Sequence, residues 1–274
     1  MSARAIGSAT IAFGLVSIPV KVYASTDSGQ AIRFHQINPE TGSRVRQQLV
    51  DGSTGEVVER KELVKGYEVA DDQYVLFTKD ELKSAEVEAT RSIDIDEFVP
   101  IASVDPMYFD TPYYLGPGKG GSRAYALLRE SLQGSGLGAI GQYAARGKQQ
   151  IVMLRADDTG LVMQRLHYAD EVRSWDDIPA GDEVELKKQE LELAKKIVKM
   201  GTVDEFDPSR YEDQVRLKLM EMIEAKREGK VISAPSEDKP QSQVIDLMEA
   251  LKKSLDDKKS KTSSSSKSKE KKSA

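Results

Sequence analysis

The sequence predicts an α+β protein in which a barrel of short strands precedes a set of amphipathic helices. Two observations lead to this fold class. Strand-like segments separated by turn residues follow one another closely from about residue 9 to 115, a spacing typical of a barrel rather than of a parallel sheet. Beyond residue 183 the apolar residues recur with helical spacing instead. With 274 residues, 39% apolar and 31% charged, the chain is long enough to bury a core.

The strands are predicted from alternation and from the turn residues between them. The stretch TIAFGLVSIPVKVYAS (10–25) indicates two short strands or one bent strand, with Gly14 and Pro19 marking the bend or an edge. Two further strands, AIRFHQIN and SRVRQQLV, flank a turn, and DGSTGE is a second turn that returns the chain through VVER as a hairpin. More strands are expected in YEVADDQYVLFT, EATRSIDIDEFVPI and MYFDTPYYL.

The middle of the chain carries one short helix and the last strands. GPGKGGSR (116–123) is expected to be a flexible loop, with Ser122 capping a helix over AYALLRESL that ends near Gly134. AIGQYAARGKQQIVMLRA is predicted as one strand, and it leads through the turn DDTG into LVMQRLHYADEV. We find no internal repeat.

Three helices are predicted towards the C-terminus. The first covers residues 183–200, with Leu191, Ala194 and Val198 on one stripe, and the second runs from the cap Asp207 and Pro208 to Gly229. After the linker SAPSEDKPQS, a narrow apolar stripe predicts a third helix over 242–255. A short helix between a linker and a charged tail has no core of its own nearby, so we expect it to dock on a partner through Leu247, Met248 and Leu251.

Charge is unevenly distributed. The formal net charge is -5, yet residues 251–274 hold nine lysines against three acidic residues, a balance of +6 that leaves -11 on the other 250 residues. Such a low-complexity tail is expected to be disordered, and it either solubilises the protein or attracts phosphates. No apolar run approaches the ~20 residues that a membrane span needs. We therefore expect a cytoplasmic protein without a membrane partner. The absence of cysteine excludes disulfides, thiolate metal sites and a cysteine nucleophile.

No standard catalytic motif is present. The chain lacks the P-loop, G-x-S-x-G and H-E-x-x-H patterns, and GPGKGG resembles a phosphate loop in composition only. With two histidines, His35 and His167, a histidine metal site or triad would need both. In SIDIDEF, Asp94 and Asp96 have the spacing of paired carboxylates that bind Mg²⁺. Ordinary strand alternation, with Ile93 and Ile95 facing the core, is the favoured interpretation of that stretch.

Basic residues form the candidate binding surface. Arg44 and Arg46 share one face of the predicted strand SRVRQQLV without an acidic neighbour between them. From spacing alone, a solvated strand face is the better interpretation. Basic residues also cluster elsewhere, and alternating cations of this kind match an electrostatic track for phosphates. These further candidates are Arg146 and Lys148 in AARGKQ, and Lys119 and Arg123 in the glycine-rich loop.

Several segments together closely resemble the bacterial Ku family of DNA-end-binding proteins of non-homologous end joining. The resemblance rests on FGLVSIPVKVYAS (13–25), IRFHQIN (32–38), ELVKGYEV (62–69), DIDEFVPIASVDPMYFDTPYYLGP (94–117), AYALLRE (124–130) and MIEAKREGK (222–230). It covers roughly residues 1–232 in order, and the lysine-rich tail is similar to the extension of many bacterial members.

The resemblance implies a homodimer. Each subunit would contribute a Ku-type β-barrel core, a strand bridge and a C-terminal helical arm, and two subunits would close a ring that threads onto a duplex end. Residues 1–232 would then be the Ku core. Residues 233–250 would form the linker and the start of the partner-docking helix, and residues 251–274 the end of that helix and the tail. By the same resemblance Arg44 and Arg46 line the hole, followed by Arg146 and Lys148, and then by Lys119 and Arg123.

The function expected from this resemblance is non-catalytic, sequence-independent binding of double-stranded DNA ends in a cytoplasmic, nucleoid-associated protein. The family's partner is an ATP-dependent DNA ligase, DNA ligase D. The chain has no K-x-D-G motif, so no catalytic residue, cofactor or metal is assigned to it. The alternative is a protein-interaction scaffold whose DNA binding is incidental. A metal-dependent nuclease built on Asp94 and Asp96 is a distant third.

Overall fold

The computed structural model describes residues 3–27, 29, 31–86, 90–145, 147–179, 181 and 184–229. The chain divides into two compact units, Met1–Ile178 and Pro179–Ala274. The first contains all the strands, and the described part of the second contains two α-helices. None of the described helices is long and apolar enough to cross a membrane.

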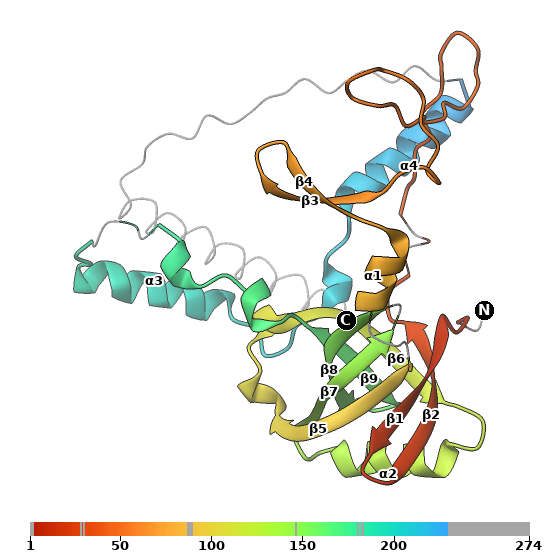
Figure 1. Ribbon diagram of the computed structural model, residues 1–274. Helices are drawn as coiled ribbons and strands as arrows, with labels where there is room; N and C mark the ends of the chain where they lie inside the picture. The colour runs from red at the N-terminus through yellow and green to blue at the C-terminus, as the bar shows by residue number, and fades with distance from the viewer. Residues whose placement is uncertain are drawn as a thin grey trace. The chain divides into compact units, whose positions relative to one another are not determined.

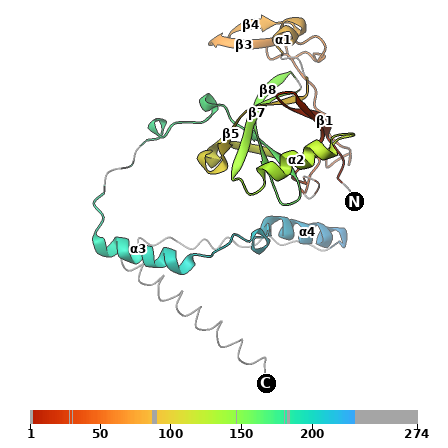
Figure 2. The same cartoon turned by 90° about the horizontal axis from the view of Figure 1, so that it is seen from below.

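The first unit is built on a closed barrel of seven strands in the order β1-β2-β6-β9-β8-β7-β5, which confirms the predicted barrel (Figure 1). Every neighbouring pair is antiparallel except β1 and β5, whose parallel pairing closes the barrel. Figure 2 shows the strands following one another round it. The strands are β1 (Gly7–Phe13), β2 (Val16–Ala24), β5 (Ser92–Pro100), β6 (Phe109–Pro117), β7 (Leu137–Ala145), β8 (Lys148–Ala156) and β9 (Leu161–Leu166).

The core fills the inside of the barrel. Alternate residues of each strand point inwards, so that Ile11, Ile18 and Ile93 are almost wholly buried together with residues from β6 to β9. Helix α2 (Ser122–Leu132) lies at the end of the barrel that carries the turn between β1 and β2 (Figure 1). Its Tyr125 anchors the helix, because the hydroxyl donates to the carbonyl of Leu115 at 2.6 Å and accepts from the Leu161 N–H at 2.8 Å.

Several local predictions about the barrel are confirmed. The stretch at 10–25 forms two strands joined at Gly14, whose φ of 56° lies in the left-handed region that favours glycine. Pro19 lies in β2 just before the first residue that pairs with β6, which is Val20. Its missing N–H therefore removes no hydrogen bond between β2 and β6. Ile93 is buried and Ile95 half-buried, while Asp94 and Asp96 are exposed, as ordinary alternation predicts.

Two predictions in the middle of the chain are wrong. AIGQYAARGKQQIVMLRA is a hairpin, because β7 ends at Ala145, the antiparallel strand β8 begins at Lys148, and Gly147 just before it has a φ of 75°. The cap of α2 is Gly121, and Ser122 is already helical. The loop before α2 also packs closely on β2: a Cβ at Gly118 or Gly121 would lie 2.8 Å or 2.7 Å from the carbonyl oxygen of Pro19. Gly118 and Gly121 therefore allow this close packing.

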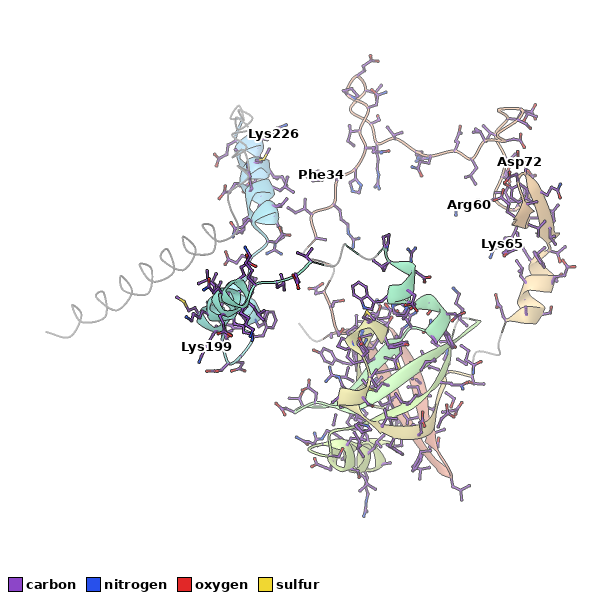
Figure 3. The ribbon with its side chains drawn as sticks, turned by 90° about the vertical axis from the view of Figure 1, so that its left-hand side faces the viewer. Phe34, Arg60, Lys65, Asp72, Lys199 and Lys226 are labelled. Atoms are coloured by element: carbon purple, nitrogen blue, oxygen red, sulfur yellow. The ribbon has the colours of Figure 1, made fainter. Side chains whose placement is uncertain are left out.

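The chain leaves the barrel after β2 and returns at β5, and we call residues 31–86 of this excursion the bridge segment. It contains the hairpin of β3 (Lys65–Ala70) and β4 (Gln73–Phe77), as predicted, and the helix α1 (Lys79–Ala85). Helix α1 was not predicted, although Thr78 and Glu81 form a capping box at its start. None of the residues of the bridge segment is buried. Phe34 and Arg60, labelled in Figure 3, are among its exposed side chains.

The predicted strands AIRFHQIN and SRVRQQLV are not regular strands. They meet in one isolated bridge pair, Ile37 with Arg44, and a second pair joins Val50 to Val57 on either side of the predicted turn DGSTGE. The reversal through VVER is therefore confirmed, but it is one bridge pair long. Each of these bridge pairs is held by backbone hydrogen bonds beside its turn. The Val45 N–H donates to the carbonyl of Gln36, and the Val58 N–H donates to the carbonyl of Leu49.

The described part of the second unit consists of α3 (Lys188–Gly201) and α4 (Gln214–Arg227). Helix α3 starts five residues later than predicted. The cap Asp207 and Pro208 begins only a 3₁₀ turn, Pro208–Arg210, and α4 starts after a second cap, Asp213. No described residue of this unit is buried. Four further 3₁₀ turns of the first unit lie within described residues, at Ile101–Ser103, Pro106–Tyr108, Ala169–Glu171 and Trp175–Asp177.

Candidate nucleic-acid interface

Arg44 and Arg46 lie between two turns of the bridge segment that have the same construction. In each turn an Asn or Asp side chain accepts from the N–H groups two and three residues ahead: Asn38 from Glu40 and Thr41, and Asp51 from Ser53 and Thr54. A glycine with positive φ follows, Gly42 or Gly55. The pattern [N/D]-x-x-T-G thus occurs twice, 13 residues apart.

These turns determine where the two arginines stand. Arg44 occupies the bridge position directly after the first turn, opposite Ile37, and Arg46 follows two residues later. Both are exposed, and neither forms an ion pair within the described residues. The two guanidinium groups are therefore available to an anionic partner.

One carboxylate near this pair stays charged. Hydrogen bonds from the Ser53 hydroxyl and from the N–H groups of Thr54 and Ser53 lower the pKa of Asp51 to about 2. Asp51 thus carries a full negative charge at neutral pH. All three hydrogen bonds go to its Oδ1, so this carboxylate stabilises the local turn.

The other predicted basic residues separate into two groups. One end of the barrel, which we call the barrel mouth, is where β1, β5, β6 and β8 begin and where β2, β7 and β9 end. Lys148 lies there as the first residue of β8. Because β2 ends and β5 begins there, the bridge segment leaves and re-enters the barrel at this end. Lys119, just before α2, and Arg123, in its first turn, are exposed at the opposite end. Arg146 and the docking residues Leu247, Met248 and Leu251 lie outside the described residues.

The barrel mouth also holds two basic residues that the sequence analysis missed. Arg91 and Arg165 line one pocket together with Lys148. Arg91 is held by backbone bonds, its N–H donating to Ala144 and its carbonyl accepting from Thr10, both at 3.0 Å. Arg165 forms an ion pair with Asp110 at 3.1 Å. A signal existed for Arg165, which lies on the same strand two residues from the core residue Met163 and so shares its inward face. Arg91 gave no such signal, because it precedes β5 and its φ of 54° interrupts the strand alternation.

The paired carboxylates do not extend into a metal cluster. Asp94 accepts from the Ser92 hydroxyl at 2.5 Å, and Asp96 is exposed on the same strand. Within the part of the chain that the structure describes, no group of three or more His, Cys, Asp or Glu side chains is placed to hold a metal ion.

Comparison with known proteins assigns this barrel to a family. The family model of the Ku70/Ku80 beta-barrel domain matches residues 12–193. This chain belongs to the Ku family. The match runs from the end of β1, through the bridge segment and the other six strands of the barrel, into α3, so it includes the segment that carries Arg44 and Arg46.

Relatives named "Non-homologous end joining protein Ku" are similar along most of this Ku chain. The protein of Paraburkholderia phymatum is 46% identical over 258 residues, 93% of this chain and 83% of its own length. That of Archaeoglobus fulgidus is 38% identical over 256 residues, 92% of this chain and 98% of its own. That of Bacillus subtilis is 36% identical over 250 residues, 90% and 80% of the two chains. The resemblance expected from the sequence is confirmed.

Proposed function

We propose that this Ku chain is a non-catalytic clamp that binds double-stranded DNA ends in non-homologous end joining. Its relatives are named for that pathway at up to 46% identity over most of the chain. The proposed clamp is a homodimeric ring threaded by the duplex. Recognition through sugar and phosphate would accept ends of any sequence, which suits a binder of broken DNA.

One observation carries the homodimer. The bridge segment and the described part of the second unit contain no buried residue, although both carry large apolar side chains. Segments that bury nothing cannot offset the entropy of ordering their own backbone, which is roughly 1–2 kcal/mol per residue. A second copy of the chain supplies the missing apolar surface, and two-fold symmetry gives each copy the same contacts.

Arg44 and Arg46 are the proposed lumen contacts. They are exposed, free of ion pairs among the described residues, and on a segment that would cross the DNA in such a ring. Lys148 is the next candidate because the bridge segment joins the barrel at its end, and the sequence adds Arg146, two residues earlier. Lys119 and Arg123, at the opposite end, remain predictions of lower rank. With several basic residues gathered in the proposed lumen, an overall charge of -5 does not oppose DNA binding.

A topological comparison tests the clamp. Full-length protein should bind a linear duplex far better than a covalently closed circle of the same sequence, because a closed circle has no end to thread. Electrophoretic mobility shift at equal base-pair concentration measures this difference. Linearising the circle with one restriction cut should restore binding. Equal affinity for circle and linear duplex would contradict the ring and favour a scaffold with incidental DNA binding.

We further propose that the DNA-bound ring recruits and stimulates an ATP-dependent DNA ligase of the ligase D type through the apolar stripe at 242–255. The sequence supports this by placing Leu247, Met248 and Leu251 on one helical face. Changing these three residues to aspartate should leave end binding intact but abolish stimulation of end joining by the ligase. Changing Gln243 and Glu249, outside that stripe, to alanine is the matched control. Full stimulation by the aspartate variant would remove the docking proposal.

A further inference from the structure

The barrel mouth contains a pocket of about 650 Å³ that opens on the barrel interior. Its floor is apolar, since Val22 and Met163 belong to the buried core. The half-buried rings of Tyr113 and Tyr143 line its wall. A pocket of this size, with an apolar floor and a few polar groups, falls within the range of small-molecule sites, which are found in the mouths of β-barrels among other places.

Two inward-facing rows of the barrel end in cations at this pocket. On β8, Gln150 and Lys148 continue the row of the core residue Val152, and on β9 Arg165 continues the row of Met163. Arg91, just before β5, lines the same pocket from outside any strand. Barrel closure brings the three cations to one opening. The chain thus changes from apolar to positively charged where the interior meets solvent.

These charges are only partly compensated. No carboxylate is among the described residues that line the pocket, and only Arg165 has an ion pair there, with Asp110. The Nε of Arg165 is buried and has no hydrogen-bond partner. Arg91 and Lys148 form no ion pair among the described residues. Like charges gathered over an apolar floor repel one another, and a bound anion of several charges would relieve that repulsion.

We propose that the barrel mouth is a binding pocket for a phosphate-bearing ligand. Arginine presents a planar fork that matches phosphate oxygens, and lysine adds a point charge. Three cations match a multiply charged phosphate better than a single carboxylate. The ligand is either a backbone phosphate of the DNA or a free phosphorylated small molecule. The pocket stands on its own geometry and does not rest on the proposed clamp.

The first experiment uses inorganic tripolyphosphate as the probe and contains no DNA. Isothermal titration of the full chain should show binding that weakens at least tenfold in the double variant Arg91→Asn, Lys148→Gln. Asparagine is chosen because the φ of Arg91 is 54°, which Asn tolerates. The variant Lys148→Arg should retain binding, and thermal unfolding should show that all variants are folded.

A charge-matched control separates the pocket from general attraction, including that of the lysine-rich tail. The variant Lys196→Gln, Lys199→Gln removes two charges from α3, where Lys199 is labelled in Figure 3, and should bind tripolyphosphate like the parent. Equal weakening in both double variants, or no weakening in the barrel-mouth variant, overturns the pocket. Either result leaves the comparison of linear and circular DNA untouched, so the two proposals fail independently.

The second arm identifies the source of the phosphate. The variant for this arm is the single change Arg91→Asn, because Lys148 is itself a candidate for the DNA lumen. If the phosphate belongs to DNA, tripolyphosphate should displace a labelled duplex, and Arg91→Asn should flatten the log–log salt dependence of DNA binding by ~0.9 for each phosphate that is no longer neutralised. If it belongs to a free molecule, Arg91→Asn should bind the duplex with the affinity and salt dependence of the parent. Once the double variant has lost tripolyphosphate binding, either result supports the pocket. The first result assigns its ligand to the DNA backbone, and the second assigns it to a free phosphorylated molecule.

Discussion

Changing Leu191 and Val198 of α3 to glutamine is expected to give a folded protein that is monomeric and no longer binds DNA ends. Both side chains are exposed in the single chain, to 43% and 70%, so their loss costs the isolated subunit little. In the proposed homodimer this stripe is covered by the partner. Each buried Leu or Val contributes about 1.5–3 kcal/mol.

Symmetry doubles the effect, because both substitutions occur in each subunit. Removing four apolar side chains from the interface costs roughly 6 kcal/mol, or about 10⁴-fold in the dimer dissociation constant. Glutamine is chosen since its helix propensity is close to that of leucine, so α3 itself should persist. The expected result is therefore loss of assembly with retained helix content.

Sedimentation velocity at several concentrations measures the oligomeric state, and circular dichroism measures the helix content. The matched control changes Gln189 to alanine and Lys196 to glutamine, which lie on the opposite side of α3 by helical spacing. This control should remain dimeric. A dimer in the Leu191→Gln, Val198→Gln variant would show that the apolar stripe of α3 is not the subunit contact.

The double substitution Arg44→Ala, Arg46→Ala is expected to weaken DNA-end binding by about 10³-fold at ~0.15 M salt. Each phosphate contact adds ~0.9 to the log–log salt slope, which corresponds to roughly 0.7 log units at that ionic strength. Four arginines in the homodimer therefore account for about three log units. The slope itself should fall by ~3.6.

Fluorescence anisotropy with a labelled duplex at four or more salt concentrations measures both quantities. Lysine at the same positions keeps the charge and should retain most of the salt slope, which separates loss of charge from damage to the bridge segment. The dimer should be intact in all variants. If the double alanine variant bound DNA with unchanged affinity and slope, the scaffold interpretation would replace the proposed lumen contacts.

The barrel strands were predictable where the pattern is local. Alternation in SIDIDEF correctly placed Ile93 inside and Asp94 outside, since a strand buried on one face needs only period two. Gly14 marked the β1–β2 turn because its positive φ is rare for other residues. The same logic would have found the turn at Gly147, but the polar residues around it also fit an exposed strand, so β7 and β8 were predicted as one element.

The candidate site was predictable only in part. Arg44 and Arg46 were singled out by their spacing, yet the proposed strand under them is an irregular stretch between two turns, because each turn is held by its own side chain–backbone bonds and needs no neighbouring sheet. The repeated [N/D]-x-x-T-G turn was visible in the sequence and was missed. Helix α1 was missed as well, although Thr78 and Glu81 carry a capping-box pattern.

Short-range rules thus account for turns, caps and the inward or outward direction of each side chain, since these depend on a few neighbouring residues. Which side chains come together at the end of the barrel depends instead on how the barrel closes. The parallel pairing of β1 with β5 and the order of the other strands bring Arg91, Lys148 and Arg165 to one opening, although up to 74 residues separate them along the chain. No spacing within the sequence encodes that meeting, because it follows from hydrogen bonds between strands that are distant in the chain.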